Sequence, residues 1–225
     1  MLIDPIVEYT LITHWLEQFI DRTTTPKKFA NQLRKFLNTR HEIKLSTVYL
    51  NEALDLNDFT VAALYDVWGD EHGKKPIVFS FIINHPLDEP WEITSTIADE
   101  LALEIIEALV HEYQHLHQYR VRDYILNMPY ESLEEDLDLR SEQEYLGQMD
   151  EIDAYAVNIA VRQYIRKDTQ SLDLDKYRKT FGSDHWVVRR LLKKISKRLH
   201  QLDLNNRCTS TETWSASDHP KNLNE

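Results

Sequence analysis

The sequence predicts an α+β fold that occupies a single domain over residues 1–204. Apolar residues recur at helical spacing near the start of the chain and again in its second half. Between these parts, residues 43–84 contain short runs rich in β-branched and aromatic residues, which favour strands. The 225 residues are enough to bury a substantial core without disulfides. We therefore expect a small sheet between two helical parts of the chain.

The first part of the domain, residues 1–40, is predicted to form a pair of helices over 5–20 and 26–39. Pro26 follows a run of threonines, which is typical of a first helical turn. The apolar side chains that follow at helical spacing are Phe29, Leu33, Phe36 and Leu37.

Residues 43–84 are predicted to form a small, mainly antiparallel sheet. Its strands are expected in the runs IKLSTVYL, FTVAALYDVW and KPIVFSFIIN, which are separated by turn residues. The second and third runs should pair as antiparallel neighbours. In IVFSFII both alternating faces are largely apolar, so we expect a strand that is covered on both faces rather than an exposed edge.

The second half of the domain is predicted to be helical. A long helix is expected over 94–124, and apolar side chains cover much of the circumference of its first half, so it should be well buried. Residues 130–146 are acidic with few aliphatic side chains, which predicts a loop or an exposed helix. Helices are expected again over 147–202, and the last of them is apolar on one side and basic on the other. The polar segment 205–225 is expected to be a disordered tail.

Composition argues against several classes of protein. The net charge of −12 disfavours general nucleic-acid binding, because a polyanion attracts lysine and arginine. The 4 glycines are scattered, so we expect no glycine-rich phosphate loop. No apolar run approaches the about 20 residues of a membrane span, and Asp4 and Glu8 lie where a secretory signal would be basic. With Cys208 as its single cysteine, we expect a soluble protein of the cytoplasm.

The segment HEYQH, residues 111–115, is the strongest candidate for a functional site. His111 and His115 are four residues apart, so on the predicted helix both rings can reach a single ion. Zinc accepts two imidazole nitrogens and needs at least one further protein ligand. Glu112 is the next residue around the helix, which takes its carboxylate beside a metal-bound water rather than onto the metal. The motif therefore predicts a Zn²⁺ site with Glu112 as the general base.

A second segment, GQMDEIDAYAVNIA, lies on a later predicted helix. Together with HEYQH it resembles the zincin superfamily of HExxH metallopeptidases, in particular the gluzincin branch, whose second helix supplies a glutamate ligand within a Glu-x-x-Ala pattern. The residues EIDA that begin at Glu151 have this pattern, so the resemblance implies that Glu151 is the third zinc ligand. Asp150 and Asp153 are the alternatives. The resemblance covers about residues 60–165 and extends to uncharacterised phage-encoded and bacterial proteins of this type.

One position departs from the family pattern. Where many gluzincins place an aspartate directly after the alanine to orient the first histidine, this chain has Tyr155. A metal-bound histidine normally needs an acceptor for the proton on its second ring nitrogen. Tyr155, Asp153, Asp150 and a backbone carbonyl are the candidates.

Other residues are weaker candidates. His117 points away from the ligand pair on a helix, which favours a surface or hydrogen-bonded histidine. Three glutamates lie on the same helical stripe as His111: Glu100, Glu104 and Glu107. A solvated stripe is the expected role of these glutamates, and the alternative is that they line a cleft for cationic groups. His185 and Tyr145 are candidates for stabilising an oxyanion.

The resemblance implies a zincin-like fold, in which a small sheet packs on the HExxH helix, and zinc-dependent hydrolysis of an amide bond in a peptide or protein. The implied substrate lies along the sheet edge as an added strand. The alternative is a non-catalytic binding or regulatory protein on a zincin scaffold, related to phage and acting through its basic C-terminal helix. A further alternative is hydrolysis of a non-protein amide such as a cell-wall peptide cross-link. We expect a peptide or protein partner, neither membrane nor nucleic acid, and the host cytoplasm as the location if the chain is phage-encoded.

Overall fold

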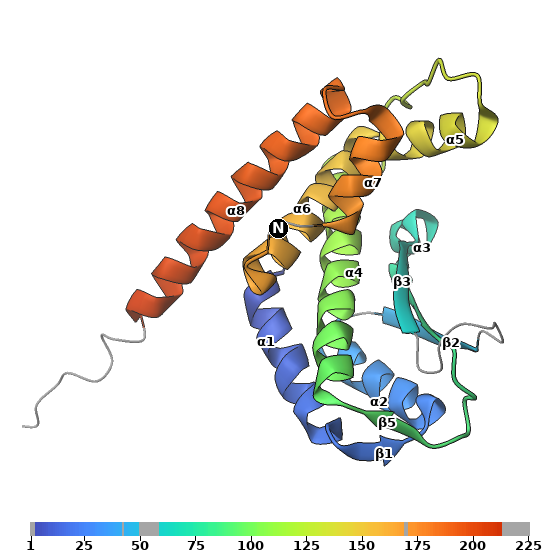
Figure 1. The fold of residues 1–225 in the computed structure, drawn as a ribbon, viewed down its shortest axis with the longest axis vertical. Helices are drawn as coiled ribbons and strands as arrows, with labels where there is room; N and C mark the ends of the chain where they lie inside the picture. The colour runs from blue at the N-terminus through green and yellow to red at the C-terminus, as the bar shows by residue number, and fades with distance from the viewer. Residues whose placement is uncertain (1–2, 42, 50–58, 169–170, 213–225) are drawn as a thin grey trace, which may run out of the picture.

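The computed structural model describes residues 3–41, 43–49, 59–168 and 171–212, and it has the predicted α+β fold (Figure 1). Its helices are α1 (Pro5–Leu16), the short 3-10 helix η1 (Glu17–Phe19), α2 (Pro26–Asn38), α3 (Val67–Glu71), α4 (Ser95–Val121), α5 (Leu137–Leu146), α6 (Met149–Arg166), α7 (Leu172–Phe181) and α8 (Trp186–Glu212). Its strands are β1 (Arg22–Thr24), β2 (Ile43–Tyr49), β3 (Phe59–Tyr65), β4 (Ile77–Ile83) and β5 (Trp91–Ile93).

The predicted N-terminal pair of helices is confirmed as α1 and α2, and each begins at a capped proline. Asp4 caps α1 by accepting hydrogen bonds from the backbone amides of Ile6 and Val7. Thr25 caps α2 in the same way, and Pro26 fills the first turn, where no amide donor is needed. The ring of Trp15 on α1 packs against aromatic rings of α2, and Phe29 of α2 packs against Phe81 of β4.

The larger sheet has the order β2-β4-β3, so β4 is the central strand. The strands β3 and β4 are antiparallel, as predicted. The strands β2 and β4 are parallel, so the larger sheet is mixed, and the expected mainly antiparallel pairing holds for only one of its two strand pairs. The strands β1 and β5 form a separate antiparallel pair.

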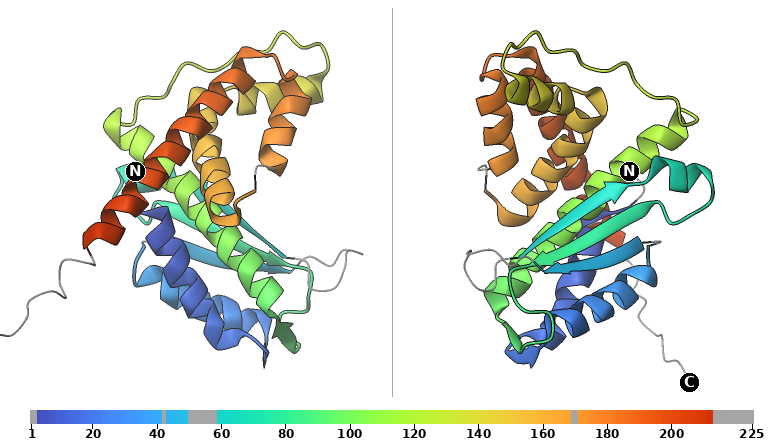
Figure 2. Two further views of the ribbon diagram at one scale, coloured as in Figure 1. Left: turned by 60° about the vertical axis from the view of Figure 1, so that its left-hand side comes forward. Right: turned by 90° about the vertical axis from the view of Figure 1, so that its right-hand side faces the viewer.

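The prediction that the third run is covered on both faces is wrong. Ile77, Phe79, Phe81 and Ile83 are buried on the face that carries α2 and α4, whereas the alternate residues of β4 are only half-buried. On the same open face, Leu64 of β3 is 65% exposed. Apolar residues on both faces of a short strand therefore do not require two covering layers here, because the helices of the described residues pack on one face only (Figure 2).

The long helix α4 runs through the centre of the molecule, with β3 on one side and α6 on the other (Figure 1). Thr94 caps its start by accepting from the backbone amide of Ile97. In turn, α6 is covered by α8. The central position of α4 follows from the apolar side chains that surround its first half and are fully buried: Leu101, Leu103, Ile105, Ile106 and Leu109.

The C-terminal region differs from the prediction in extent. The acidic region contains a helix, α5, and α7 is a separate short helix capped by Ser171. The last helix continues to Glu212, so the backbone over 205–212 is helical rather than disordered, and the rest of the predicted tail, 213–225, lies outside the described residues. Within the part of the chain that the structure describes, no helix is both long and apolar enough to cross a membrane.

A buried polar network fixes the C-terminal end of α4. The side chain of Asp70 on α3 is 4% exposed and accepts hydrogen bonds from Arg120 Nε at 2.9 Å, Tyr65 Oη at 2.7 Å and Tyr124 Oη at 3.0 Å. Burial alone would raise the pKa of Asp70, but the hydrogen bonds from Arg120 and the two tyrosines outweigh burial and hold the pKa below its ordinary value. The network therefore anchors α3 and the end of β3 to α4.

We expect Asp70→Asn to lower the free energy of unfolding by about 2 kcal/mol at neutral pH, because the buried carboxylate that accepts from Arg120 and the two tyrosines loses its charge. The folded-state pKa of Asp70 is depressed, so its contribution is present above the ordinary carboxyl pKa of about 3.9 and is lost as the pH falls through the depressed value. In urea unfolding, the difference in free energy of unfolding between wild type and variant should therefore become smaller at acid pH.

The matched control is Asp88→Asn. Asp88 pairs with Lys27 at 3.1 Å, but the two side chains are 77% and 61% exposed, so the loss should stay below about 0.5 kcal/mol. An equal loss in both variants, or a gap for Asp70→Asn that does not depend on pH, would contradict the role given to this network.

Candidate metal centre

His111 and His115 lie on adjacent turns of α4, and their rings converge as helical spacing predicts. Both side chains are buried, and their Nε2 atoms are 3.1 Å apart. His115 Nδ1 lies 3.1 Å from Gln118 Oε1, an acceptor, so the neutral ring of His115 carries its proton on Nδ1 and presents a lone pair on Nε2.

Glu151 meets the two rings from the first turn of α6. Its Oε1 is 3.4 Å from His115 Nε2, and its Oε2 is 3.5 Å from His111 Nε2. Ligand atoms at about 2.0–2.1 Å from a tetrahedral zinc lie about 3.3 Å from one another, which is close to these separations. Residues His111, His115 and Glu151 thus form a group that could hold a metal ion.

The electrostatics of Glu151 fit a cation. Its Oε2 atom is buried and makes no hydrogen bond within the described part of the chain. Burial would raise the pKa of Glu151, but its contacts with the rings of His111 and His115 outweigh burial and lower the pKa to about 2. The carboxylate is therefore ionised, and a bound cation would stabilise its charge in place of the ring protons.

The two alternative third ligands are engaged elsewhere. The carboxylate of Asp150 accepts from Arg122 at 2.7 and 3.1 Å and from Asn127 at 2.8 Å. Asp153 accepts from Lys194 of α8 at 3.0 Å. Neither aspartate belongs to the metal-binding group found among the described residues. The structure therefore brings together the three residues predicted as ligands, and not the alternatives.

Glu112 lies beside this group without being part of it. Its side chain is buried, and burial raises its pKa, although the charges of His111 and His115 partly offset this effect. A hydrogen bond with the backbone of Tyr65 acts in the same lowering direction. A buried carboxylate with a raised pKa is a stronger proton acceptor than an ordinary surface carboxylate.

Sequence reasoning missed two residues that touch the histidines. Gln118 binds His115 Nδ1 and donates to the backbone oxygen of Asp150 at 3.2 Å. The amide of Asn158 lies 3.3 Å from His111 Nδ1. Asn158 is seven residues after Glu151, which is about two helical turns and therefore the same face of α6, so the spacing could have identified it.

Of the two candidates for oxyanion stabilisation, only Tyr145 is at the site. Tyr145 lines the cavities beside His111 and Glu112, and burial together with the charge of Glu151 raises its pKa, so the hydroxyl stays protonated. His185 stacks on Phe181 instead and lines neither cavity. His117 is half-buried and lies outside the metal-binding group.

The glutamate stripe is not simply solvated, because β3 and α6 cover it. Glu104 Oε2 accepts from the backbone amide of Val61 at 2.7 Å, and Glu107 pairs with Arg162 at 3.0 Å. Burial raises the pKa of Glu107 to about 7, although Arg162 offsets part of this effect. Glu100, the most exposed of the three, pairs with Arg162 and Arg166 at the surface.

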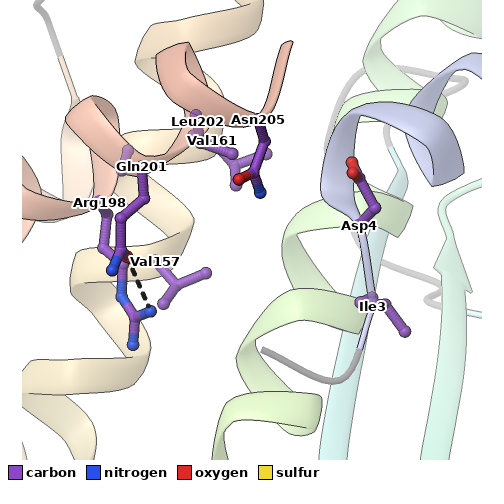
Figure 3. A pocket seen from close by; sticks show the side chains of 9 residues that line it. Ile3, Asp4, Val157, Val161, Arg198, Gln201, Leu202 and Asn205 are labelled. Carbon is purple, nitrogen blue, oxygen red and sulfur yellow. Dashed lines mark hydrogen bonds between the residues drawn. The ribbon is translucent and has the colours of Figure 1, made fainter. Parts of the chain in front are cut away.

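Two adjoining cavities open onto the metal-binding group. One of about 210 Å³ is lined by all three candidate ligands, and one of about 370 Å³ extends past Glu104, Glu107 and Asp173. Both include Ala63 of β3, so together they follow the edge of the sheet. A third cavity of about 390 Å³, between the start of α1, α6 and α8, shares no residue with the metal-binding group (Figure 3).

Comparisons of the chain with models of known protein families, with curated proteins and with solved structures found no match.

We expect Glu151→Gln to lower the affinity for zinc by more than about 100-fold, because the amide removes the charge that faces the two rings. Asp153→Asn is the matched control on the same helix turn and should bind zinc like the wild type, since its carboxylate pairs with Lys194. The zinc binding of both variants is measured by competition with a chromophoric chelator and by elemental analysis. Loss of zinc from Asp153→Asn with retention by Glu151→Gln would reassign the third ligand.

Proposed function

We propose that this protein is a zinc-dependent hydrolase of amide bonds in peptides or proteins, with a zincin-like site. The observation that carries the proposal is the position of Glu112, whose buried carboxylate lies beside three converging donor atoms without being one of them. A purely structural zinc site is closed by four protein ligands and has no use for such a group.

His111, His115 and Glu151 would hold the metal, which when bound supplies a water of lowered pKa and polarises the scissile carbonyl. Glu112 accepts the proton of the attacking water and returns it to the leaving amine. Tyr145 keeps its hydroxyl proton and can donate to the oxygen on which negative charge develops. Burial of the ligands and of Glu112 excludes bulk water and strengthens these interactions.

The edge of β3 is the proposed place for an extended substrate. β3 is an edge strand, and the two cavities run along it past Ala63 toward His111 and Glu112. The amide of Val61 is already bound by Glu104, so substrate pairing would centre on Ala63, the next residue whose main-chain groups point to the free edge. An added strand satisfies main-chain groups of the edge and fixes the scissile bond relative to the metal.

The alternative function is a non-catalytic role through the basic helix α8. Part of its charge is used within the molecule, since Lys194 binds Asp153 and Arg198 donates to Gln114 at 3.2 Å. Its apolar side packs on α6. These contacts explain much of α8 as a covering helix, which favours the hydrolase.

Glu112→Gln should leave zinc binding intact and lower the rate of hydrolysis by about 10²–10⁴-fold, because the amide cannot accept the proton of water. The assay is cleavage of a proteome-derived peptide mixture, followed by mass spectrometry. His117→Gln changes a nearby histidine outside the metal-binding group and should cleave like the wild type. Undiminished cleavage by Glu112→Gln would exclude the proposed mechanism, and a zinc-loaded wild type that cleaves nothing would favour the non-catalytic alternative.

A further inference from the structure

The second ring nitrogen of His111 faces an amide rather than a carboxylate. The side-chain amide of Asn158 lies within hydrogen-bonding distance of His111 Nδ1, at 3.3 Å. Tyr155 occupies the position at which the family pattern has an aspartate, but it packs its ring against the imidazole, with centroids 5.0 Å apart and planes at 82°. Its hydroxyl is engaged with Tyr145. Tyr155 therefore packs its ring against His111, and the hydrogen bond to His111 Nδ1 is made by Asn158.

Asn158 is well placed to act on His111 because α6 carries it on the same face as Glu151. Two turns of helix separate the residues, so the helix that provides a ligand also provides a partner for the opposite nitrogen of another ligand. The carboxylates of Asp150 and Asp153, which were the other candidates for this role, bind Arg122 and Lys194 instead.

The orientation of the Asn158 amide decides which proton His111 carries. With the amide nitrogen toward Nδ1, the buried Oδ1 atom has no hydrogen-bond partner among the described residues. A half turn of the amide exchanges oxygen and nitrogen and places the oxygen against Nδ1. The oxygen then accepts the Nδ1 proton, and His111 Nε2 presents its lone pair to His115 and Glu151. This orientation both satisfies the buried oxygen and provides the tautomer that a metal ligand needs.

We propose that Asn158 is the positioning residue of His111 and that its amide oxygen holds the Nδ1 proton of the metal-binding tautomer. This inference rests on the metal site of the proposed function. A neutral amide is a weaker acceptor than the aspartate of the family pattern, so it polarises the imidazole less. The chain therefore binds zinc less tightly than it would with aspartate at the same position.

The test compares zinc affinities measured by chelator competition. Asn158→Leu keeps the size of the side chain but removes the acceptor, and it should lower the affinity on the order of 10–100-fold. Asn158→Asp should raise the affinity above that of the wild type. The control for added charge is Leu172→Asp, because Leu172 lines the same cavity as Asn158 and is 85% exposed. Its effect should be smaller than that of Asn158→Asp.

A second measurement reports the hydrogen bond itself. In zinc-loaded wild type, NMR of the histidine ring nitrogens should show a protected proton on His111 Nδ1, and this proton should exchange rapidly in Asn158→Leu. Circular dichroism verifies folding, and the nearly isosteric Asn158→Asp keeps the test decisive if the leucine variant does not fold.

The outcomes separate this inference from the proposed function. Equal zinc affinity in wild type and Asn158→Leu, or Asn158→Asp no tighter than Leu172→Asp, would overturn the role of Asn158 alone. Failure of the wild type to bind zinc would overturn the metal site and this inference together. Neither the zinc affinity nor the NMR signal depends on peptide cleavage, so the role of Asn158 can be tested even if the protein binds zinc without cleaving peptides.

Discussion

The packing of α6 against α4 is the constraint on which the site depends. Two of the candidate ligands lie on α4 and the third on α6, so their distances are set by the approach of the two helices. A small side chain permits that approach, since Ala154 is fully buried on α6, about one turn after Glu151. Covering by α8 keeps α6 in place from the other side. Tight packing of this kind resists small displacements, which is what a fixed set of ligand atoms requires.

Polar contacts between α4 and α6 flank the metal-binding group at both ends. Toward the start of α4, Glu107 binds Arg162, and toward its end, Arg122 and Gln118 bind Asp150. These contacts are largely buried, so each fixes the rotation of one helix relative to the other more firmly than an exposed ion pair could. The rings of His111 and His115 are thereby aimed before any ligand arrives, and no large rearrangement is needed to form the site.

The sequence predicted the parts of this arrangement that depend on local spacing. Helical periodicity was sufficient for α4 and for the convergence of His111 and His115, because positions four residues apart always share a side. The choice among Asp150, Glu151 and Asp153 could not be made from spacing, since it depends on which carboxylate Arg122 and Lys194 neutralise. Those cations lie far along the chain or on another element.

Contacts between elements that are distant in the chain also explain what the sequence did not predict. The parallel pairing of β2 with β4 and the open face of the sheet depend on the order of strands and on which helices cover them, and neither leaves a local pattern. Helical spacing places Asn158 on the same face of α6 as Glu151, but the ring that it meets depends on how α6 is rotated about its axis against α4. Tyr155 held the expected position in the sequence, but its ring cannot provide the hydrogen bond expected there.

The start of α6 links the site to the local stability of this helix. Gln148 makes no side-chain cap there among the described residues, so the first turn is secured by what its carboxylates bind: Asp150 holds Arg122 and Asn127, and Glu151 faces the two rings. A first turn without a side-chain cap depends on these tertiary partners for its stability. Fraying of a single turn would withdraw Glu151 and dissolve the donor set. Ion binding at Glu151 and the local folding equilibrium of this helix terminus are therefore thermodynamically linked, so an ion held there would stabilise the first turn of α6.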